Sequence, residues 1–213
     1  MHIKKLIKKR SFYQDASFFI NSERETIKQP ITKPILLSLG LGFFFQTSPK
    51  SFHTGDKAEN FTLQNQDNQQ ISLDSYLGKY VILYFYPKDN TPGCTKEACS
   101  LQANWEAFTK EGIEVIGINY DSVKSHKKFA AKQGIKFNLL SDSNKKVAKR
   151  YSACWYLLEL FPMPFPKRKT FIINPQGYII EIINNVDVGT HTYMALKIID
   201  AHKKTQTNTA SKK

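Results

Sequence analysis

The stretch from 81 to 108 constrains this chain most, because its pattern changes from a buried strand to a helix within a few residues. Residues 81–86, VILYFY, form an apolar run typical of a strand buried on both faces. Pro87 cannot donate to a sheet ladder and ends that strand, and the turn pairs Asp-Asn and Pro-Gly follow it. The next apolar residues recur at helical spacing: Ala98, Leu101, Trp105 and Phe108. The sequence therefore predicts a core strand that leads directly into a helix.

Cys94 falls in the first turn of that predicted helix. With Thr91 as the N-cap, Pro92 takes the first helical position, which suits its fixed φ and missing N–H. Unpaired N–H groups and the positive end of the helix dipole favour an anion there, and the thiolate is the reactive form of cysteine. Cys94 is therefore a candidate nucleophile. The alternative is a small buried residue in a turn, and the second cysteine nearby makes us prefer the nucleophile.

Cys94 and Cys99 lie at positions i and i+5. On a regular helix their Cα atoms would be roughly 8 to 9 Å apart, whereas a disulfide needs about 4.4 to 6.8 Å. The pair cannot bridge while the helix is intact, so its first turn would have to unwind. This spacing favours a redox switch over a permanent structural disulfide, and it differs from the Cys-x-x-Cys pair of disulfide oxidoreductases.

The motif PKDNTPGC at 87–94 matches the Pro-x-x-x-Thr-x-x-Cys signature of peroxiredoxins. With Cys99 it resembles the bacterioferritin comigratory protein, or peroxiredoxin Q, branch of that family. The similarity runs from about Gly55 to about Lys204 and includes the stretches LLSDSNKKVAKRY and KRKTFIINPQG. The resemblance implies an α/β, thioredoxin-like fold with a central mixed sheet flanked by helices. The alternation of predicted strands and helices is in keeping with it.

The resemblance also implies a mechanism and a set of site residues. Cys94 would be the peroxidatic nucleophile that attacks hydrogen peroxide or an organic hydroperoxide, and Cys99 would resolve the resulting sulfenic acid as an intramolecular disulfide. Thioredoxin or a similar dithiol would reduce that disulfide. Thr91 and Arg168 would polarise the O–O bond, and Pro87 would fix the turn that leads to the helix. No metal, haem or flavin cofactor is implied, and the branch is often monomeric.

Arg168 stands two residues before Thr170, where the peroxiredoxin pattern places an arginine that points at the reactive cysteine. A permanent cation with a fork of donors would stabilise a thiolate and hold a peroxide oxygen. Lys167 and Lys169 flank it, so the alternative is a group of three surface charges. The Thr91 hydroxyl could donate to the peroxide while it accepts from a backbone N–H, and a pure capping role is compatible with this.

The remaining cysteine and the histidines suggest no second site. Cys154 lies in an apolar stretch and is interpreted as core packing, with a reserve resolving thiol as the alternative. The histidines are scattered and make no ligand set with the cysteines, so metal binding is not expected. We interpret them as surface or capping residues: His2, His53, His126, His191 and His202. The segment 157–166, LLELFPMPFP, is apolar and proline-rich and is predicted to be a loop.

Other elements follow from periodicity and turn signals. A hairpin is predicted from 61–63 and 70–72, and further strands at 113–119, 137–140, 169–173 and 178–183. Helices are predicted at 122–133, with Ser122 as the cap and Gly134 after the end, at 144–151, and at 190–203. The last helix should bury one face that carries Met194, Ile198 and Ala201. We expect one domain at 51–204 and a polar basic tail at 205–213.

The formal net charge of +13 belongs mostly to the two ends of the chain. Residues 1–50 carry nine Lys/Arg and three acids, and 203–213 carry four Lys and no acid. Solvated tails are preferred over a nucleic-acid surface, because the middle shows no stripe of arginines with interleaved aromatics. The apolar run 35–45 is shorter than the ~20 residues that span a bilayer. It could be an export signal or anchor, a stretch upstream of the true start, or a segment lying on the domain. We expect a cytoplasmic protein, with export or anchoring through 35–45 as the alternative.

Two other functions stay open. A protein dithiol–disulfide oxidoreductase would need a Cys-x-x-Cys pair, which the chain lacks. A peroxide sensor without turnover would oxidise once and would not be recycled by thioredoxin.

Overall fold

The computed structural model describes residues 51–157 and 161–210, and side chains within them except those of 155–164, 209 and 210. These residues belong to one compact unit, Ser48–Lys213. The predictions for 1–50, including the apolar run 35–45, lie outside the described residues. Within the described ranges, no helix is both long and apolar enough to cross a membrane.

A mixed seven-stranded sheet forms the centre of the domain, in the order β2-β1-β5-β4-β3-β8-β9. β3 is parallel to β4, which is parallel to β5, while β8 pairs antiparallel with β3 and the edge strand β9 pairs antiparallel with β8. β3 is fully buried, as its apolar sequence predicts. The strands are β1 (Thr62–Asn65), β2 (Gln70–Ser72), β3 (Tyr80–Phe85), β4 (Ile113–Asn119), β5 (Asn138–Ser141), β8 (Lys169–Ile173) and β9 (Ile179–Ile183).

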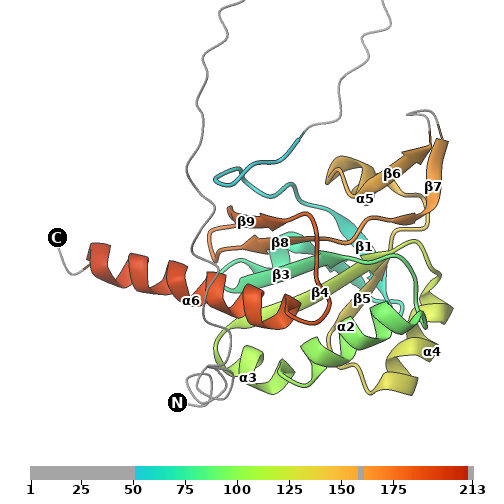
Figure 1. The fold of residues 1–213 in the computed structure, drawn as a ribbon, viewed down its shortest axis with the longest axis horizontal. Coiled ribbons are helices and arrows are strands. Elements are labelled where there is room, and N and C mark those ends of the chain that lie inside the picture. The colour runs from blue at the N-terminus through green and yellow to red at the C-terminus, as the bar shows by residue number, and fades with distance from the viewer. Residues whose placement is uncertain (1–50, 158–160, 211–213) are drawn as a thin grey trace, which may run out of the picture. The chain divides into compact units, whose positions relative to one another are not determined.

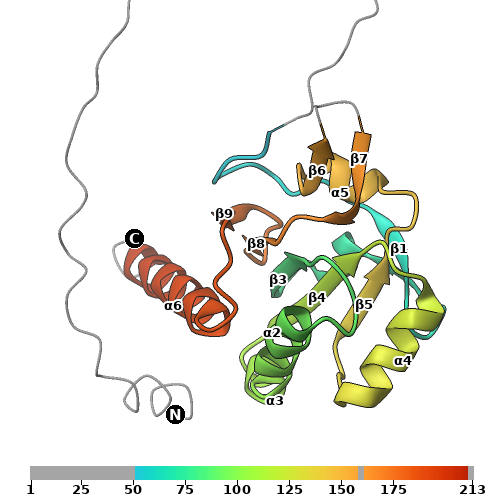
Figure 2. The same cartoon turned by 45° about the vertical axis from the view of Figure 1, so that its right-hand side comes forward.

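Helices cover the two faces of the sheet unequally (Figures 1 and 2). Alternate residues of β3 point to opposite faces, which separates two hydrophobic clusters. One cluster holds Tyr84 with side chains from α2 (Pro92–Gln102), α3 (Trp105–Lys110), α4 (Val123–Gln133) and α6 (His191–Ala210). The other holds Phe85 with side chains from η1 (Leu73–Tyr76) and α5 (Lys146–Arg150). The face that carries Tyr84 is the one on which the candidate nucleophile lies.

Several element predictions are confirmed by the structure. Ser122 caps α4 by accepting from the Ser125 N–H, and Gly134 ends that helix in the left-handed conformation at φ 64°. The long helical pattern after Cys94 divides into α2 and α3, which are separated at Ala103–Asn104. The closing helix continues beyond the predicted 203 to Ala210, so residues 205–210 are helical.

Two predictions were wrong. The segment 157–166 is not a plain loop, because β6 (Cys154–Leu157) and β7 (Phe161–Pro166) pair as an antiparallel hairpin. A two-stranded edge ribbon can tolerate prolines that a central strand cannot. The buried face of α6 carries Ala195, Leu196 and Ile199, while Met194 and Ala201 are exposed. The periodicity was correct, but the phase was off by about one residue.

Candidate functional site

Cys94 lies where β3 gives way to α2. Thr91 has extended backbone angles and Pro92 is the first helical residue, so the predicted N-terminus is confirmed. Cys94 is in the first turn and only 1% exposed. The Thr91 hydroxyl makes no capping bond and donates instead to the Lys88 carbonyl at 3.1 Å. The N–H groups of the first turn thus do not donate to the Thr91 hydroxyl, which leaves them suited to bind an anion.

Arg168 reaches the sulfur of Cys94 from β8. Its Nη2 donates to Cys94 Sγ at 3.1 Å, across 74 residues of sequence. Strand alternation places residues 168, 170 and 172 toward the face that α2 covers. Lys169 points to the opposite face, where its Nζ donates to the Tyr151 carbonyl at 3.3 Å and burial lowers its pKa. Arg168 is therefore not one of three equivalent surface charges.

Glu97 is a member of the site that the sequence reasoning missed. It lies three residues after Cys94, on the same face of α2, and is 1% exposed. One of its oxygens, Oε2, accepts from Arg168 Nη1. A buried carboxylate is costly unless it is paired, so Glu97 fixes one side of the guanidinium while the other side faces Cys94. The spacing to Cys94 was the signal that could have found it.

His191 was predicted as a surface or capping residue, and this was wrong. The residue is 2% exposed in the first turn of α6. Its Nδ1 lies 3.1 Å from Glu97 Oε1, and its Nε2 lies 2.9 Å from Thr170 Oγ1. The Tyr84 ring packs edge-on against it, with centroids 6.2 Å apart. Burial raises the pKa of Tyr84 well above its usual value, so this phenol stays neutral.

Cys99 is a free, half-buried thiol on α2. Its sulfur contacts Gln133 Oε1 of α4 at 3.6 Å. α2 runs unbroken from Pro92 through both cysteines, so they are held apart by the helix between them. Both thiols are reduced in this structure.

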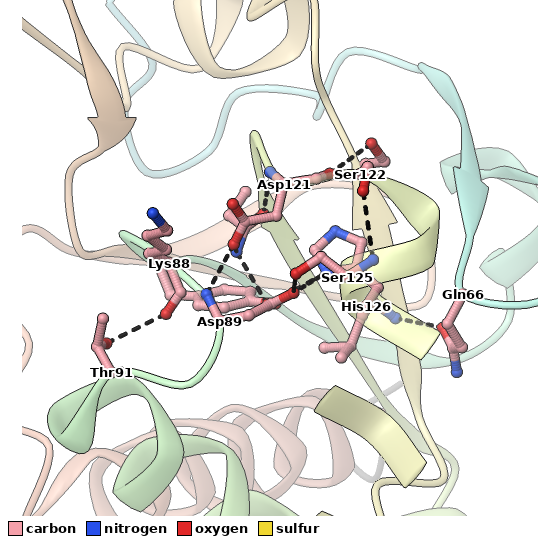
Figure 3. A network of polar contacts seen from close by, with 12 residues as sticks. Gln66, Lys88, Asp89, Thr91, Asp121, Ser122, Ser125 and His126 are labelled. Atoms are coloured by element: carbon pink, nitrogen blue, oxygen red, sulfur yellow. Dashed lines mark hydrogen bonds and ion pairs between the residues drawn. The ribbon is translucent and has the colours of Figure 1, made fainter. Parts of the chain in front are cut away.

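Asp89 lies within the turn between Pro87 and Thr91 and ties it to neighbouring elements (Figure 3). The sequence marked it only as a turn residue, yet it is 5% exposed. Its carboxylate accepts from Tyr86, Asn119, Ser125 and His126 at 2.7 to 3.2 Å. Burial alone would raise the Asp89 pKa, but the bonds from His126, Ser125 and Tyr86 and the charge of His126 lower it. His126 is fully buried, so its predicted surface role was also wrong.

Cys154 is separate from this cluster and is 2% exposed. Its sulfur lies 2.9 Å from the Tyr120 hydroxyl. Burial raises the pKa of this thiol, so it is held in the unreactive form, in keeping with core packing. Among the described residues, no group of three or more His, Cys, Asp and Glu side chains could hold a metal ion.

The fold and the site have the arrangement of a thiol-based redox protein, in which a cysteine at a helix N-terminus contacts an arginine on the same face of a thioredoxin-like sheet. Comparisons with known proteins agree. The AhpC/TSA family model matches residues 54–182. The chain belongs to the AhpC/TSA family, on its peroxiredoxin Q and bcp branch.

Three relatives illustrate the match. Peroxiredoxin Q, chloroplastic, of Triticum aestivum is 43% identical over 68% of this chain and 65% of its own length. The putative peroxiredoxin bcp of Coxiella burnetii is 42% identical over 66% of this chain and 94% of its own length. The crystal structure of a mutant PrxQ from Xylella fastidiosa superposes with a TM-score of 0.65 at 32% identity, over 71% of this chain and 97% of that one. The chain thus spans slightly less than two thirds of the length of the wheat relative.

Proposed function

We propose that the protein is a thiol peroxidase that reduces hydrogen peroxide and organic hydroperoxides and so protects against oxidative stress. The observation that carries the proposal is the 3.1 Å contact between Arg168 Nη2 and the Cys94 sulfur at the N-terminus of α2. A permanent cation and an open helix N-terminus favour a thiolate. They also stabilise the negative charge that develops on the departing oxygen.

The reaction has three steps. The Cys94 thiolate attacks one peroxide oxygen, the O–O bond breaks, and the leaving oxygen takes a proton to become water or an alcohol. The first turn of α2 then unwinds, and the Cys99 sulfur attacks the Cys94 sulfenic acid, which forms the disulfide and releases water. Thioredoxin or a similar dithiol reduces the disulfide and is itself oxidised. Arg168 donates to the peroxide, the Thr91 hydroxyl, which donates to the Lys88 carbonyl, accepts from the peroxide, and Pro87 fixes the turn before the helix.

Both cysteines lie on one helix of one chain. No second chain is needed for resolution, so we propose that the protein works as a monomer. Its reductant and its preferred peroxide are proposed by class only.

Peroxide consumption with a thioredoxin recycling system tests the proposal on wild type, Cys94→Ser and Cys99→Ser. Turnover should be lost in both variants, while Cys99→Ser should still consume about one peroxide per chain in a single turnover. Full activity in Cys94→Ser would refute the assignment. Normal recycling in Cys99→Ser would show that another thiol resolves the sulfenic acid. Cys154→Ser is the matched control and should retain turnover.

A further inference from the structure

The strongest unexplained feature is a buried chain of polar contacts behind the Cys94–Arg168 pair. It leads from Cys94 through Arg168 and Glu97 to His191, and ends at Thr170. The proposed mechanism uses only its first two members. Arg168 from just before β8, Thr170 of β8, Glu97 of α2 and His191 of α6 thus meet behind the nucleophile.

The contact between Glu97 and His191 is isolated from solvent. Each side chain is 1% exposed, and among the described residues Glu97 Oε1 and His191 Nδ1 make no hydrogen bond, so their 3.1 Å approach to each other is the polar contact that each has. Buried polar atoms are costly when unpaired, so each of these atoms depends on the other. Thr170 fixes the opposite ring nitrogen of His191 at 2.9 Å, which sets the orientation of the ring.

A second contact fastens the two helices at the same place. Thr192 Oγ1 lies 2.9 Å from Ser100 Oγ of α2. The N-terminal turn of α6 is therefore held in register with the face of α2 that carries Cys94 and Glu97.

The charges of these side chains suggest what the arrangement does. Glu97 and the Cys94 thiolate are two anions that share the guanidinium of Arg168. The His191 ring, 3.1 Å from Glu97 Oε1, occupies the side of the carboxylate that faces away from Arg168 and leaves Glu97 Oε2 to the guanidinium. The Tyr84 ring of β3, which also packs against His191, stays neutral. Without His191, Glu97 Oε1 would lose its polar contact, and the carboxylate could turn and carry the guanidinium away from Cys94.

We propose that His191 is a positioning residue, which holds the Glu97 carboxylate so that Arg168 stays aimed at the Cys94 sulfur. This inference rests on the proposed peroxidase function. It assigns α6, which contributes no group in contact with the sulfur, a role in setting its reactivity.

The test measures single-turnover oxidation of Cys94 by hydrogen peroxide in the Cys99→Ser background. His191→Phe should slow this oxidation about tenfold, because the buried Glu97 carboxylate loses the polar contact that holds it in place. His191→Gln keeps a donor at the same place and should recover most of the rate. His202→Phe is the matched control, because His202 also lies on α6 and bonds a hydroxyl, that of Tyr80 at 2.9 Å, away from Glu97. It should leave the rate unchanged.

A second readout separates positioning from mere stability. The pH midpoint of Cys94 alkylation by iodoacetamide should move upward in His191→Phe and not in His202→Phe. An unchanged rate and midpoint in a folded His191→Phe protein would overturn the inference, even if its melting temperature fell. If His191→Phe does not fold, the test uses Thr170→Val in its place, and Thr170→Ser is the control. An unchanged alkylation midpoint in Thr170→Val would also overturn the inference. Failure of the wild type to turn over peroxide would instead refute the proposed function.

Discussion

Gly93, the residue before the nucleophile, gives Arg168 its space. A Cβ built on Gly93 would lie 2.9 Å from Arg168 Nη2, closer than side chains tolerate. The guanidinium is the far end of a flexible side chain, so in Gly93→Ala it should swing aside rather than unfold the helix. Alanine is also the better helix former by roughly 1 kcal/mol. We expect single-turnover peroxide oxidation to fall about tenfold, which is the loss of one charge-assisted contact.

The stability of Gly93→Ala should equal or exceed that of wild type in urea unfolding. Thr95→Ala, two residues further along α2, is the control. It should change neither the oxidation rate nor the stability. A Gly93→Ala protein that oxidises at the wild-type rate would show that the Arg168 contact does not limit reactivity.

Residue-level prediction from sequence succeeded where local patterns carry the information. Cys94 was placed correctly because its neighbours Thr91 and Pro92 define a helix start. Glu97 and His191 were missed because their burial depends on partners far away in the sequence: Arg168 is 71 residues from Glu97. The spacing of Glu97 from Cys94 shows that both share a face of α2, but the sequence near His191 gives no signal of its pairing with Glu97.

The element on which the proposed reaction depends is α2, because Cys94 and Cys99 cannot meet until its first turns unwind. Lys96 lies between them on the exposed side of the helix. Lys96→Gly should lower the helix stability there by roughly 1 kcal/mol relative to Lys96→Ala. The unwound state would then be populated more often, and closure of the disulfide should be about fivefold faster in the glycine variant.

Both Lys96→Gly and Lys96→Ala lack the lysine side chain, so the two variants differ mainly in helix propensity. Disulfide closure after a stoichiometric peroxide pulse can be followed by acid quench and mass spectrometry. Equal closure rates in the two variants would argue that α2 does not unwind around residue 96 during resolution.

Elements were predictable where hydrophobic period and end signals agree. β4 has the predicted bounds, and α4 has both its predicted cap and its predicted glycine end. The face of α6 was not predictable, because apolar residues occupy two adjacent stripes: Met194 and Ile198 on one, Ala195 and Ile199 on the other. Only packing against the sheet selects the second stripe. The β6–β7 hairpin was missed because its prolines resemble those of a loop.

At the scale of the described domain, the sheet and the helices meet around Asp89. Its carboxylate joins the end of β3 through Tyr86 and α4 through Ser125 and His126. This junction supports the turn that contains Thr91 and leads into α2 (Figure 3). Tertiary contacts of this kind fix the active-site turn more firmly than the turn propensities of Asp89 and Asn90 can.

Asp89→Asn should therefore destabilise the domain at pH 7, by about 3 kcal/mol or more, because it leaves a buried partner unpaired. The matched control is Asp67→Asn, whose ion pair with Lys127 spans 3.6 Å with both side chains more than half exposed; it should cost less than about 1 kcal/mol.

The pKa of Asp89 is held below its ordinary value of 3.8. The contribution of ionised Asp89 to the free energy of unfolding is thus fully present above pH 3.8 and is lost as the pH falls through the lower pKa of the folded state. Urea unfolding followed by circular dichroism should show the difference in free energy of unfolding between wild type and Asp89→Asn at pH 7 and pH 5. This difference should become smaller toward pH 3. A gap of the same size at pH 3 would mean that the ionised carboxylate is not what holds this junction together.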